Sequence, residues 1–468
     1  MSGQQETGWL ADLIYRDQKF ESGCAMFADE SGRILRFSTE PDDLARAGRL
    51  RNRAILPGLV NCHSHSFQRV IRGRTEHRSA AARDTFWTWR EAMYRAASLL
   101  SPDDLYHTAR MTFLEMVMSG ITTVGEFHYL HNSIDGSRYE DPNLIARQVI
   151  RAARDIGVRI ALLRTAYARA GWRKPANPAQ ARFITGTPEM FLADTDALCA
   201  GLQKESRPGF AWLGIAPHSL RALPVDYLAQ ISAHAREKQL PVHMHVAEQP
   251  AEIDECIAEH GRRPLEVLRD AGVLDAAFTA VHAIHITDEE IGLLRESGAR
   301  VCACPTTERN LGDGTVPADR LTQAGVGICF GSDSNVQIDL LEDARLLEYD
   351  LRMKKLERAV LAPCSGHEQL ARRLFESATR EGAAALGGAA GGCLEVGRWA
   401  DFFTVDLNDV SIAGAESDAL LANIVFSLER TAVRDVFVNG GPVIEDGHHP
   451  LEEAIVSEFK SVQRRLWK

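Results

Sequence analysis

The sequence Pro57-Gly58-Leu59-Val60-Asn61-Cys62-His63-Ser64-His65-Ser66-Phe67-Gln68 decides how the rest of this chain is interpreted. The run 54–60 is apolar and predicts a buried strand. His63 and His65 follow it, and residues i and i+2 of a strand point to the same side. Two imidazoles can then face one point, as in sites for zinc and similar divalent metals. A chain with 16 histidines can contain one such pair by chance, so the other strands must decide.

The composition is that of an ordinary globular protein, with 45% hydrophobic and 25% charged residues. A length of 468 residues suits one large domain and a small one. The net charge of −11 argues against nucleic acid or an anionic membrane as partner, although a small anionic substrate fits. Residues 1–10 lack the features of a secretory signal, and no apolar run could cross a bilayer. Nine cysteines without a regular framework predict reduced thiols in the cytoplasm.

Apolar strand patterns alternate with helical patterns through the middle of the chain. After the first strand, strand patterns occupy 120–129, 159–165, 212–218, 241–248, 278–282, 300–305 and 327–333. Helical patterns occupy 101–119, 142–156, 225–238 and 251–271. Eight strands that alternate with helices predict an α/β fold, a parallel (β/α)8 TIM-like barrel.

The two ends of the chain have a different sequence pattern, which predicts short strands and turns. It covers residues 13–54 and returns in a strand at 397–406 and a hairpin at 436–444, where Asn439-Gly440 suits a tight turn. We expect the ends to join in one small β-sandwich domain. Its two parts are residues 1–55 and 391–468, the second with a terminal helix, and the catalytic barrel occupies 56–390.

Polar and ionisable side chains stand where six of the eight predicted strands end. They are His63 with His65, Tyr129, His218, His245 with Glu248, His282 and Asp333. Active sites of (β/α)8 barrels form at the C-terminal ends of the strands. A single histidine at a strand end is more often structural than a ligand, but six coincidences at one face indicate a site.

A single metal ion accounts for four of these residues. His63, His65 and His245 supply three nitrogens and Asp333 supplies a carboxylate, which leaves room for water. A carbamylated lysine at the end of the fourth strand would bridge two metals, but His218 stands there instead. The sequence therefore favours one metal.

Two further residues have the chemistry that hydrolysis needs. Glu248 lies three residues after His245 and can take a proton from water and pass it on. His282 can orient the water or stabilise developing charge. The structural alternatives are a solvated carboxylate for Glu248 and a satisfied core histidine for His282.

The pattern of H-x-H, H-x-x-E, a later histidine and a final Ser-Asp resembles the deaminase branch of the amidohydrolase superfamily over essentially the whole chain. Longer strings resemble its formimidoylglutamate deiminase family. These strings occupy 63–69, 86–94, 126–129, 217–222, 243–249 and 310–314.

This resemblance implies hydrolysis of N-formimidoyl-L-glutamate to N-formyl-L-glutamate and ammonia, in a homodimer. It implies one divalent metal on His63, His65, His245 and Asp333, with zinc preferred and iron or manganese as alternatives. The implied catalytic residues are Glu248, His282 and Asp333. The implied substrate-binding residues are Gln68, Arg90, Tyr129, His218 and Arg221.

The two carboxylates of the implied substrate are an independent reason to place two arginines in the substrate-binding site. Arg90 and Arg221 can each bind one carboxylate by paired hydrogen bonds. The alternative for either arginine is a salt bridge at a surface or interface. Two arginines would be poor partners for a neutral purine or pterin base, which places such substrates second.

Two positions depart from the family pattern near the barrel mouth and bear on the substrate. Asn335 stands where relatives often carry histidine, and Arg164 could be a carboxylate partner or an ion pair outside the barrel. Residues 168–188, rich in Gly, Pro and basic side chains, could form a moving lid. The alternatives are a related deaminase acting on another formimidoyl amino acid or on a purine or pterin base, and a catalytically silent metal-binding scaffold.

Overall fold

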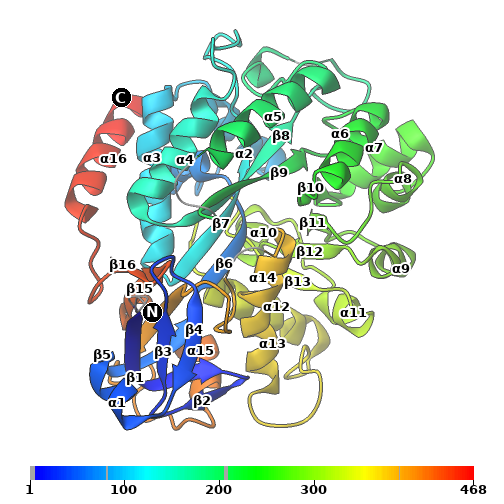
Figure 1. Cartoon of the computed structure of the whole chain (residues 1–468). Coiled ribbons are helices and arrows are strands. Elements are labelled where there is room, and N and C mark those ends of the chain that lie inside the picture. Colours follow the sequence, from blue (N-terminus) through cyan, green and yellow to red (C-terminus); the bar gives the residue numbers. More distant parts are fainter. Residues whose placement is uncertain (1–5, 81–82, 176, 205–208, 389–390) are drawn as a thin grey trace.

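The computed structural model describes residues 6–80, 83–175, 177–204, 209–388 and 391–468. Eight parallel strands, each hydrogen-bonded to the next in chain order, curl into a barrel surrounded by helices (Figure 1). The predicted (β/α)8 architecture is therefore confirmed. The strands are β6 (Leu59–Ser64), β7 (Ile121–His128), β8 (Arg159–Ala166), β9 (Ala211–Pro217), β10 (Val242–Val246), β11 (Phe278–His282), β12 (Arg300–Ala303) and β13 (Ile328–Phe330).

The first and last barrel strands approach each other through the residues that follow them. The backbone N–H of His65 donates to the carbonyl oxygen of Asp333, and the N–H of Asp333 donates to the carbonyl oxygen of His63, each at 2.9 Å. We call this contact between the segments that follow β6 and β13 the seam of the barrel, and predicted metal ligands lie on both sides of it. Closing the barrel brings their side chains together.

Helices cover the outside of the barrel and fill the connections between its strands. They are α2 (Phe86–Ala97), α3 (Pro102–Val117), α4 (Leu144–Ile156), α5 (Pro188–Gln203), α6 (Val225–Glu237), α7 (Pro250–His260), α8 (Pro264–Asp270), α9 (Asp288–Ser297), α10 (Pro305–Leu311), α11 (Ala318–Gln323), α12 (Leu340–Lys355), α13 (Gln369–Ser377) and α14 (Arg380–Ala385). Short 3₁₀ turns lie at Ser66–Ile71 and Pro178–Gln180. No helix in the described ranges combines the length and apolar character needed to cross a membrane.

The single helical pattern expected over 251–271 is in fact two helices. α7 ends at His260, and the next residue, Gly261, has a left-handed φ of +69°. α8 then begins at Pro264, whose ring suits the first position of a helix. The apolar spacing continues across the break, so periodicity alone did not reveal it.

Both chain ends contribute to one further sheet, so the predicted β domain from both ends is confirmed. Its strands are β1 (Thr7–Arg16), β2 (Lys19–Glu21), β3 (Ala25–Ala28), β4 (Ile34–Ser38), β5 (Gly48–Pro57), β14 (Phe402–Asp406), β15 (Val433–Val438) and β16 (Gly441–Ile444). The hairpin between β15 and β16 turns at Asn439 and Gly440, both with positive φ, as the sequence predicts. All eight strands are linked by hydrogen bonds in one sheet.

Three helices accompany these strands: α1 (Pro41–Arg46), α15 (Leu420–Ser427) and α16 (Glu452–Leu466). α15 packs on α12 and α13, and the terminal helix α16 lies along α3 of the barrel (Figure 1). Although the C-terminal segment begins in the small sheet, it ends on the barrel. The division into 1–55, 56–390 and 391–468 stays a proposal.

A buried ion pair joins the barrel to the small sheet. Arg159 opens β8 and Asp401 directly precedes β14, and both side chains are fully buried. Arg159 donates from Nε to Asp401 Oδ2 at 2.5 Å and from Nη2 to Oδ1 at 3.2 Å. Asp401 Oδ1 also accepts from the backbone N–H of Asn439 at 2.7 Å. The carboxylate therefore connects β8, β14 and the β15–β16 turn.

Replacing Asp401 with alanine is expected to lower the free energy of unfolding by about 3–5 kcal/mol, because the buried Arg159 would lose its counter-charge. Urea unfolding measures the change. Glu296→Ala is the control, because Glu296 pairs with Arg295 on the surface and such pairs contribute little. Equal free energies of unfolding for the two variants would contradict a stabilising role of the Arg159–Asp401 ion pair.

Candidate metal-dependent active site

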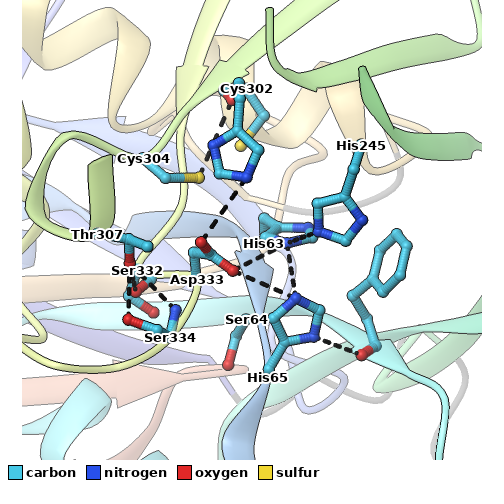
Figure 2. Close-up of polar contacts among 12 residues, drawn as sticks. His63, Ser64, His65, His245, Cys302, Cys304, Thr307, Ser332, Asp333 and Ser334 are labelled. Atoms are coloured by element: carbon cyan, nitrogen blue, oxygen red, sulfur yellow. Dashed lines mark hydrogen bonds and ion pairs between the residues drawn. The ribbon is translucent and has the colours of Figure 1, made fainter. Parts of the chain in front are cut away.

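Four predicted side chains converge where β6, β10 and β13 end (Figure 2). The Nε2 atom of His63 lies 3.2 Å from Nε2 of His65 and 3.2 Å from Nε2 of His245. Oδ1 of Asp333 lies 3.3 Å from Nε2 of His63 and 3.2 Å from Nε2 of His65. All four side chains are buried. The structure therefore brings together the whole predicted ligand set.

The hydrogen bonds of the imidazole rings determine which nitrogens of these histidines are available to bind a metal ion. Nδ1 of His65 contacts the carbonyl oxygen of Phe127, and Nδ1 of His245 contacts that of His218, each at 3.0 Å. A carbonyl only accepts, so these Nδ1 atoms carry the protons and the Nε2 atoms present lone pairs. Nitrogens bound to one tetrahedral zinc at about 2.0–2.1 Å are roughly 3.3–3.4 Å apart. The cluster therefore fits one divalent ion.

The charges of the cluster agree with a metal site. Burial lowers the pKa of His63 to about 3 and that of His245 well below its ordinary value, so both rings are neutral donors. Burial opposes ionisation of Asp333, but His63 and His65 outweigh it and hold the pKa of this carboxyl well below its usual range. Neutral imidazoles and an ionised carboxylate are the forms that bind metals.

Glu248 and His282 lie beside the cluster. His282 Nε2 is 3.7 Å from Glu248 Oε1 and 3.8 Å from Asp333 Oδ2, and it has no hydrogen-bond partner among the described residues. Burial disfavours a charge on His282, but the carboxylates of Glu248, Glu308 and Asp333 outweigh it and raise the pKa of His282 to about 10. His282 thus presents a free nitrogen to the space between two carboxylates.

The backbone is strained where these side chains leave their strands. Ala247, His282 and Asp333 all have left-handed backbone angles, with φ of +55°, +72° and +44°. Such a conformation costs on the order of 1–3 kcal/mol for a residue other than glycine. Surrounding contacts oppose the strain: the N–H groups of Ala247 and Glu248 both donate to the buried Glu252 carboxylate at 3.2 Å. Strain concentrated at three strand ends is typical of a functional site.

One pocket brings the five predicted substrate-binding residues together with His65, His245, Glu248, His282 and Asp333. The five are Gln68, Arg90, Tyr129, His218 and Arg221. Gln68 donates from Nε2 to the hydroxyl of Tyr129 at 2.9 Å, whereas its buried Oε1 has no partner among the described residues. The pocket therefore contains a hydrogen-bond acceptor without a partner, Oε1 of Gln68, close to the four candidate metal ligands.

Two cationic side chains line this pocket. Arg221 is only 5% exposed, and its Nε and Nη1 atoms lack hydrogen-bond partners in the described part of the chain. Its Nη2 lies 3.7 Å from Glu248 Oε2. Burial alone would lower the pKa of Arg221, but Glu252 and Glu248 raise it, so the guanidinium stays charged. The half-buried Arg90 lies over the ring of Trp87 at 4.5 Å.

The structure also adds residues that the sequence interpretation missed. Tyr94, Tyr167 and Phe183 line the pocket, and Gln180 donates to the hydroxyls of Tyr94 at 3.1 Å and Tyr167 at 2.7 Å. Glu308 contacts His282 directly. A usable signal existed for Tyr167 and Glu308, because each follows the end of a barrel strand.

Arg164 and Asn335, the two departures from the family pattern, lie outside the pocket lining. Arg164 is buried and donates to Asn143 Oδ1 at 3.1 Å and to Asp194 Oδ2 at 3.4 Å, which is the ion pair outside the barrel. Asn335 donates from Nδ2 to Ser64 Oγ at 3.2 Å and to the carbonyl oxygen of Asp333 at 3.1 Å. Asn335 therefore supports the seam of the barrel.

Part of the segment 168–188 is held firmly against the barrel. The buried Arg182 donates to the carbonyl oxygens of Leu100 at 2.8 Å and Asn132 at 3.1 Å. Phe183 next to it is fully buried. Residue 176 lies outside the described residues, and motion of this segment as a lid stays a prediction.

Comparison with known proteins agrees with this geometry. The model of the Amidohydrolase family matches residues 54–443. Formimidoylglutamate deiminase of Pseudomonas aeruginosa is 40% identical over 427 residues, which cover 91% of this chain and 92% of that protein. The 5-methylthioadenosine/S-adenosylhomocysteine deaminase of Halobacterium salinarum is 28% identical and covers 95% of this chain and 94% of its own length.

Solved structures give the same result. The crystal structure of an amidohydrolase from Brucella melitensis superposes with a TM-score of 0.90 at 34% identity, over 99% of this chain and 100% of that chain. An adenosine deaminase from Xanthomonas campestris with bound zinc shares the fold at 22% identity and a TM-score of 0.81, over 98% of both chains. These matches confirm the resemblance that the motifs indicate. The chain belongs to the amidohydrolase family and is a homologue of formimidoylglutamate deiminase.

Proposed function

We propose that this chain hydrolyses N-formimidoyl-L-glutamate to N-formyl-L-glutamate and ammonia. The observation that carries the proposal is the buried Arg221, whose guanidinium leaves two nitrogens unpaired in the same pocket as a metal-type cluster. A buried cation needs an anion, and here the free anion would be a substrate carboxylate. The name of the Pseudomonas aeruginosa relative supports this choice of substrate.

We further propose that His63, His65, His245 and Asp333 hold one divalent metal ion, with zinc first and iron or manganese as alternatives. Histidine nitrogens and a carboxylate oxygen are ligand types of catalytic zinc sites, where zinc can expand to five ligands. When bound, the ion supplies the Lewis acidity that makes water a nucleophile near neutral pH.

The side chains around the cluster supply the proton transfers. In the proposed reaction, water adds to the formimidoyl carbon and the terminal nitrogen leaves as ammonia, so both protons of the water must move to that nitrogen. The Glu248 carboxylate takes the first proton as the water attacks and the second as the added hydroxyl becomes the carbonyl, and gives each to the leaving nitrogen. His282 and Asp333 border the same space, and Nε2 of His282 orients the attacking water.

The substrate's glutamate part determines which groups bind it. Arg221 and Arg90 each bind one carboxylate by charge-assisted hydrogen bonds. The unpaired Oε1 of Gln68 accepts a hydrogen bond from an N–H of the substrate, and Tyr129 and His218 complete the wall of the pocket. In this arrangement the reacting carbon lies toward Glu248 and the carboxylates lie toward the arginines.

Arg221→Gln is expected to raise KM for N-formimidoyl-L-glutamate about 30-fold or more, because losing one partner of a buried charge pair costs about 2–5 kcal/mol. Steady-state kinetics of the zinc-loaded enzyme measures the change. Arg138→Gln is the control, since Arg138 pairs with Asp194 away from this pocket. If the KM of Arg221→Gln equalled that of the control, Arg221 would not bind the substrate.

A substrate panel separates the proposal from its alternatives. Ammonia release is measured with N-formimidoyl-L-glutamate, N-formimidoyl-L-aspartate and guanine. Fast turnover of the glutamate compound alone supports the proposal. Turnover of another compound instead would retain the metal-dependent hydrolysis and reject the substrate. Assembly as a homodimer and a cytoplasmic location stay predictions.

A further inference from the structure

Glu308 lies against the active site without lining its pocket. It belongs to α10, just after β12, and is only 3% exposed. Its Oε1 atom accepts two hydrogen bonds, one from the backbone N–H of Cys304 at 2.8 Å and one from Nδ1 of His282 at 3.2 Å. The first bond fixes the carboxylate to the start of α10. The second transmits that fixed position to a residue of the proposed active site.

The contact restricts His282 in two ways. A carboxylate on Nδ1 keeps a proton on that nitrogen, so Nε2 is the nitrogen that meets water or substrate. It also sets the ring's orientation, so that Nε2 faces Glu248 at 3.7 Å and Asp333 at 3.8 Å. The backbone of His282 is left-handed, with φ of +72°, so ordinary strand geometry does not position this side chain.

A second metal ion would be another explanation for this cluster. The possible ligand atoms of His282, Cys304 and Glu308 lie within 4.8 Å of one another. However, one proton between Nδ1 of His282 and Oε1 of Glu308 already satisfies these two atoms by a hydrogen bond. Burial also raises the pKa of the Cys304 thiol above its ordinary value, which disfavours the thiolate that a metal would need. In the candidate metal site of His63, His65, His245 and Asp333, by contrast, the Nε2 atoms of His65 and His245 each lie 3.2 Å from Nε2 of His63. The ring centroids of His65 and His245 are 5.5 Å apart.

We propose that Glu308 is a positioning residue, which holds the Nδ1 proton and the ring orientation of His282 for the reaction. The inference rests on the proposed function, because His282 acts there on the attacking water. Glu308 would do for His282 what the buried carboxylate of a catalytic triad does for its histidine. Glu308 touches neither substrate nor metal in this arrangement.

Glu308→Gln tests the proposal, because glutamine keeps the shape of the side chain and the bond from Cys304 but removes the negative charge that holds the proton on Nδ1 of His282. We expect kcat to fall by about 10- to 100-fold. KM should be unchanged, because Glu308 does not line the pocket. Metal analysis should still find one zinc per chain. If the wild type bound two zinc ions and Glu308→Gln bound one, the cluster would be a metal site and the proposal would be wrong.

Asp343→Asn is the matched control. Asp343 is also fully buried beside α10, and its Oδ1 accepts from the backbone N–H of Thr306 at 2.9 Å. It makes no contact with His282. If carboxylates here only stabilise α10, both variants should affect kcat alike, and that outcome would overturn the proposal. A loss of kcat confined to Glu308→Gln supports it.

A spectroscopic measurement keeps the inference independent of the substrate. In zinc-loaded protein labelled with ¹⁵N-histidine, the His282 signals are assigned by their loss in His282→Asn. We expect Nδ1 of the wild-type ring to carry a proton and Glu308→Gln to change the ¹⁵N signal of that nitrogen. An identical pattern in both would overturn the proposal. If the wild type failed to hydrolyse N-formimidoyl-L-glutamate, the proposed function would fall while this measurement still decided the role of Glu308.

Discussion

Glu248→Gln is expected to lower kcat by about 10²–10⁴-fold while one zinc per chain stays bound. Glutamine keeps the size of the side chain but cannot take a proton from water or deliver it to the leaving nitrogen, and general acid–base groups contribute this range. The metal cluster does not include Glu248, so metal content should not change. Stopped assays for ammonia and metal analysis of the same sample measure both quantities.

The control for this variant lies on α7, the helix that follows Glu248. Glu255 is half-exposed on α7 and its carboxylate is 3.8 Å from Lys174, outside the pocket. Glu255→Gln should have wild-type kcat. Turnover of Glu248→Gln within a few-fold of this control would mean that another group carries the proton. A loss of zinc from Glu248→Gln would mean that the variant had disturbed the metal cluster.

His63→Ala is expected to abolish zinc binding and to lower turnover by at least about 10³-fold, because the metal supplies several kcal/mol of transition-state stabilisation. His63 is central to the cluster, since its Nε2 approaches both other imidazoles and Asp333. Removing it leaves three ligands and a buried cavity. Zinc content after dialysis and kcat with added zinc measure the loss.

His234→Ala serves as the control for zinc binding. His234 lies on α6 and contacts Asp196 at 3.0 Å, so its loss should leave one zinc per chain. Chelation of the wild-type enzyme should reproduce the turnover of His63→Ala, and added zinc should restore activity only to the wild type. Full turnover by chelated wild type would contradict a metal-dependent reaction.

The acidic chain places two arginines in its active-site pocket. The formal net charge is −11, yet Arg90 and Arg221 lie together in the pocket, where only the Glu248 carboxylate lies within 4 Å of a guanidinium among the described residues. Net charge therefore excludes large anionic partners better than it excludes a small anionic substrate. Under the proposed function, a dicarboxylate would bind in this pocket beside the four candidate metal ligands.

Much of the fold and site could be predicted because local patterns carried the information. Eight strand patterns separated by helices determine a barrel, and side chains at strand ends of a barrel share one face. His63 and His65 needed only strand alternation to be paired. His245, His282 and Asp333 needed only the rule that strand ends meet.

The rest depended on contacts that strand patterns do not encode. Glu308 follows a strand end as the predicted residues do, but its contact with His282 depends on the start of α10. The position of Arg164 outside the barrel depends on Asn143 and Asp194, far from it in sequence. The split between α7 and α8 depends on the left-handed Gly261, although the apolar spacing runs through it.

Product analysis tests the central claim most directly. The chain, loaded with one equivalent of zinc, is incubated with N-formimidoyl-L-glutamate labelled with ¹³C at the formimidoyl carbon, and the products are followed by NMR together with an ammonia assay. We predict labelled N-formyl-L-glutamate and ammonia in equal amounts, because the protons of the water go to the terminal nitrogen. Labelled formamide with free glutamate, or no turnover at all, would contradict it.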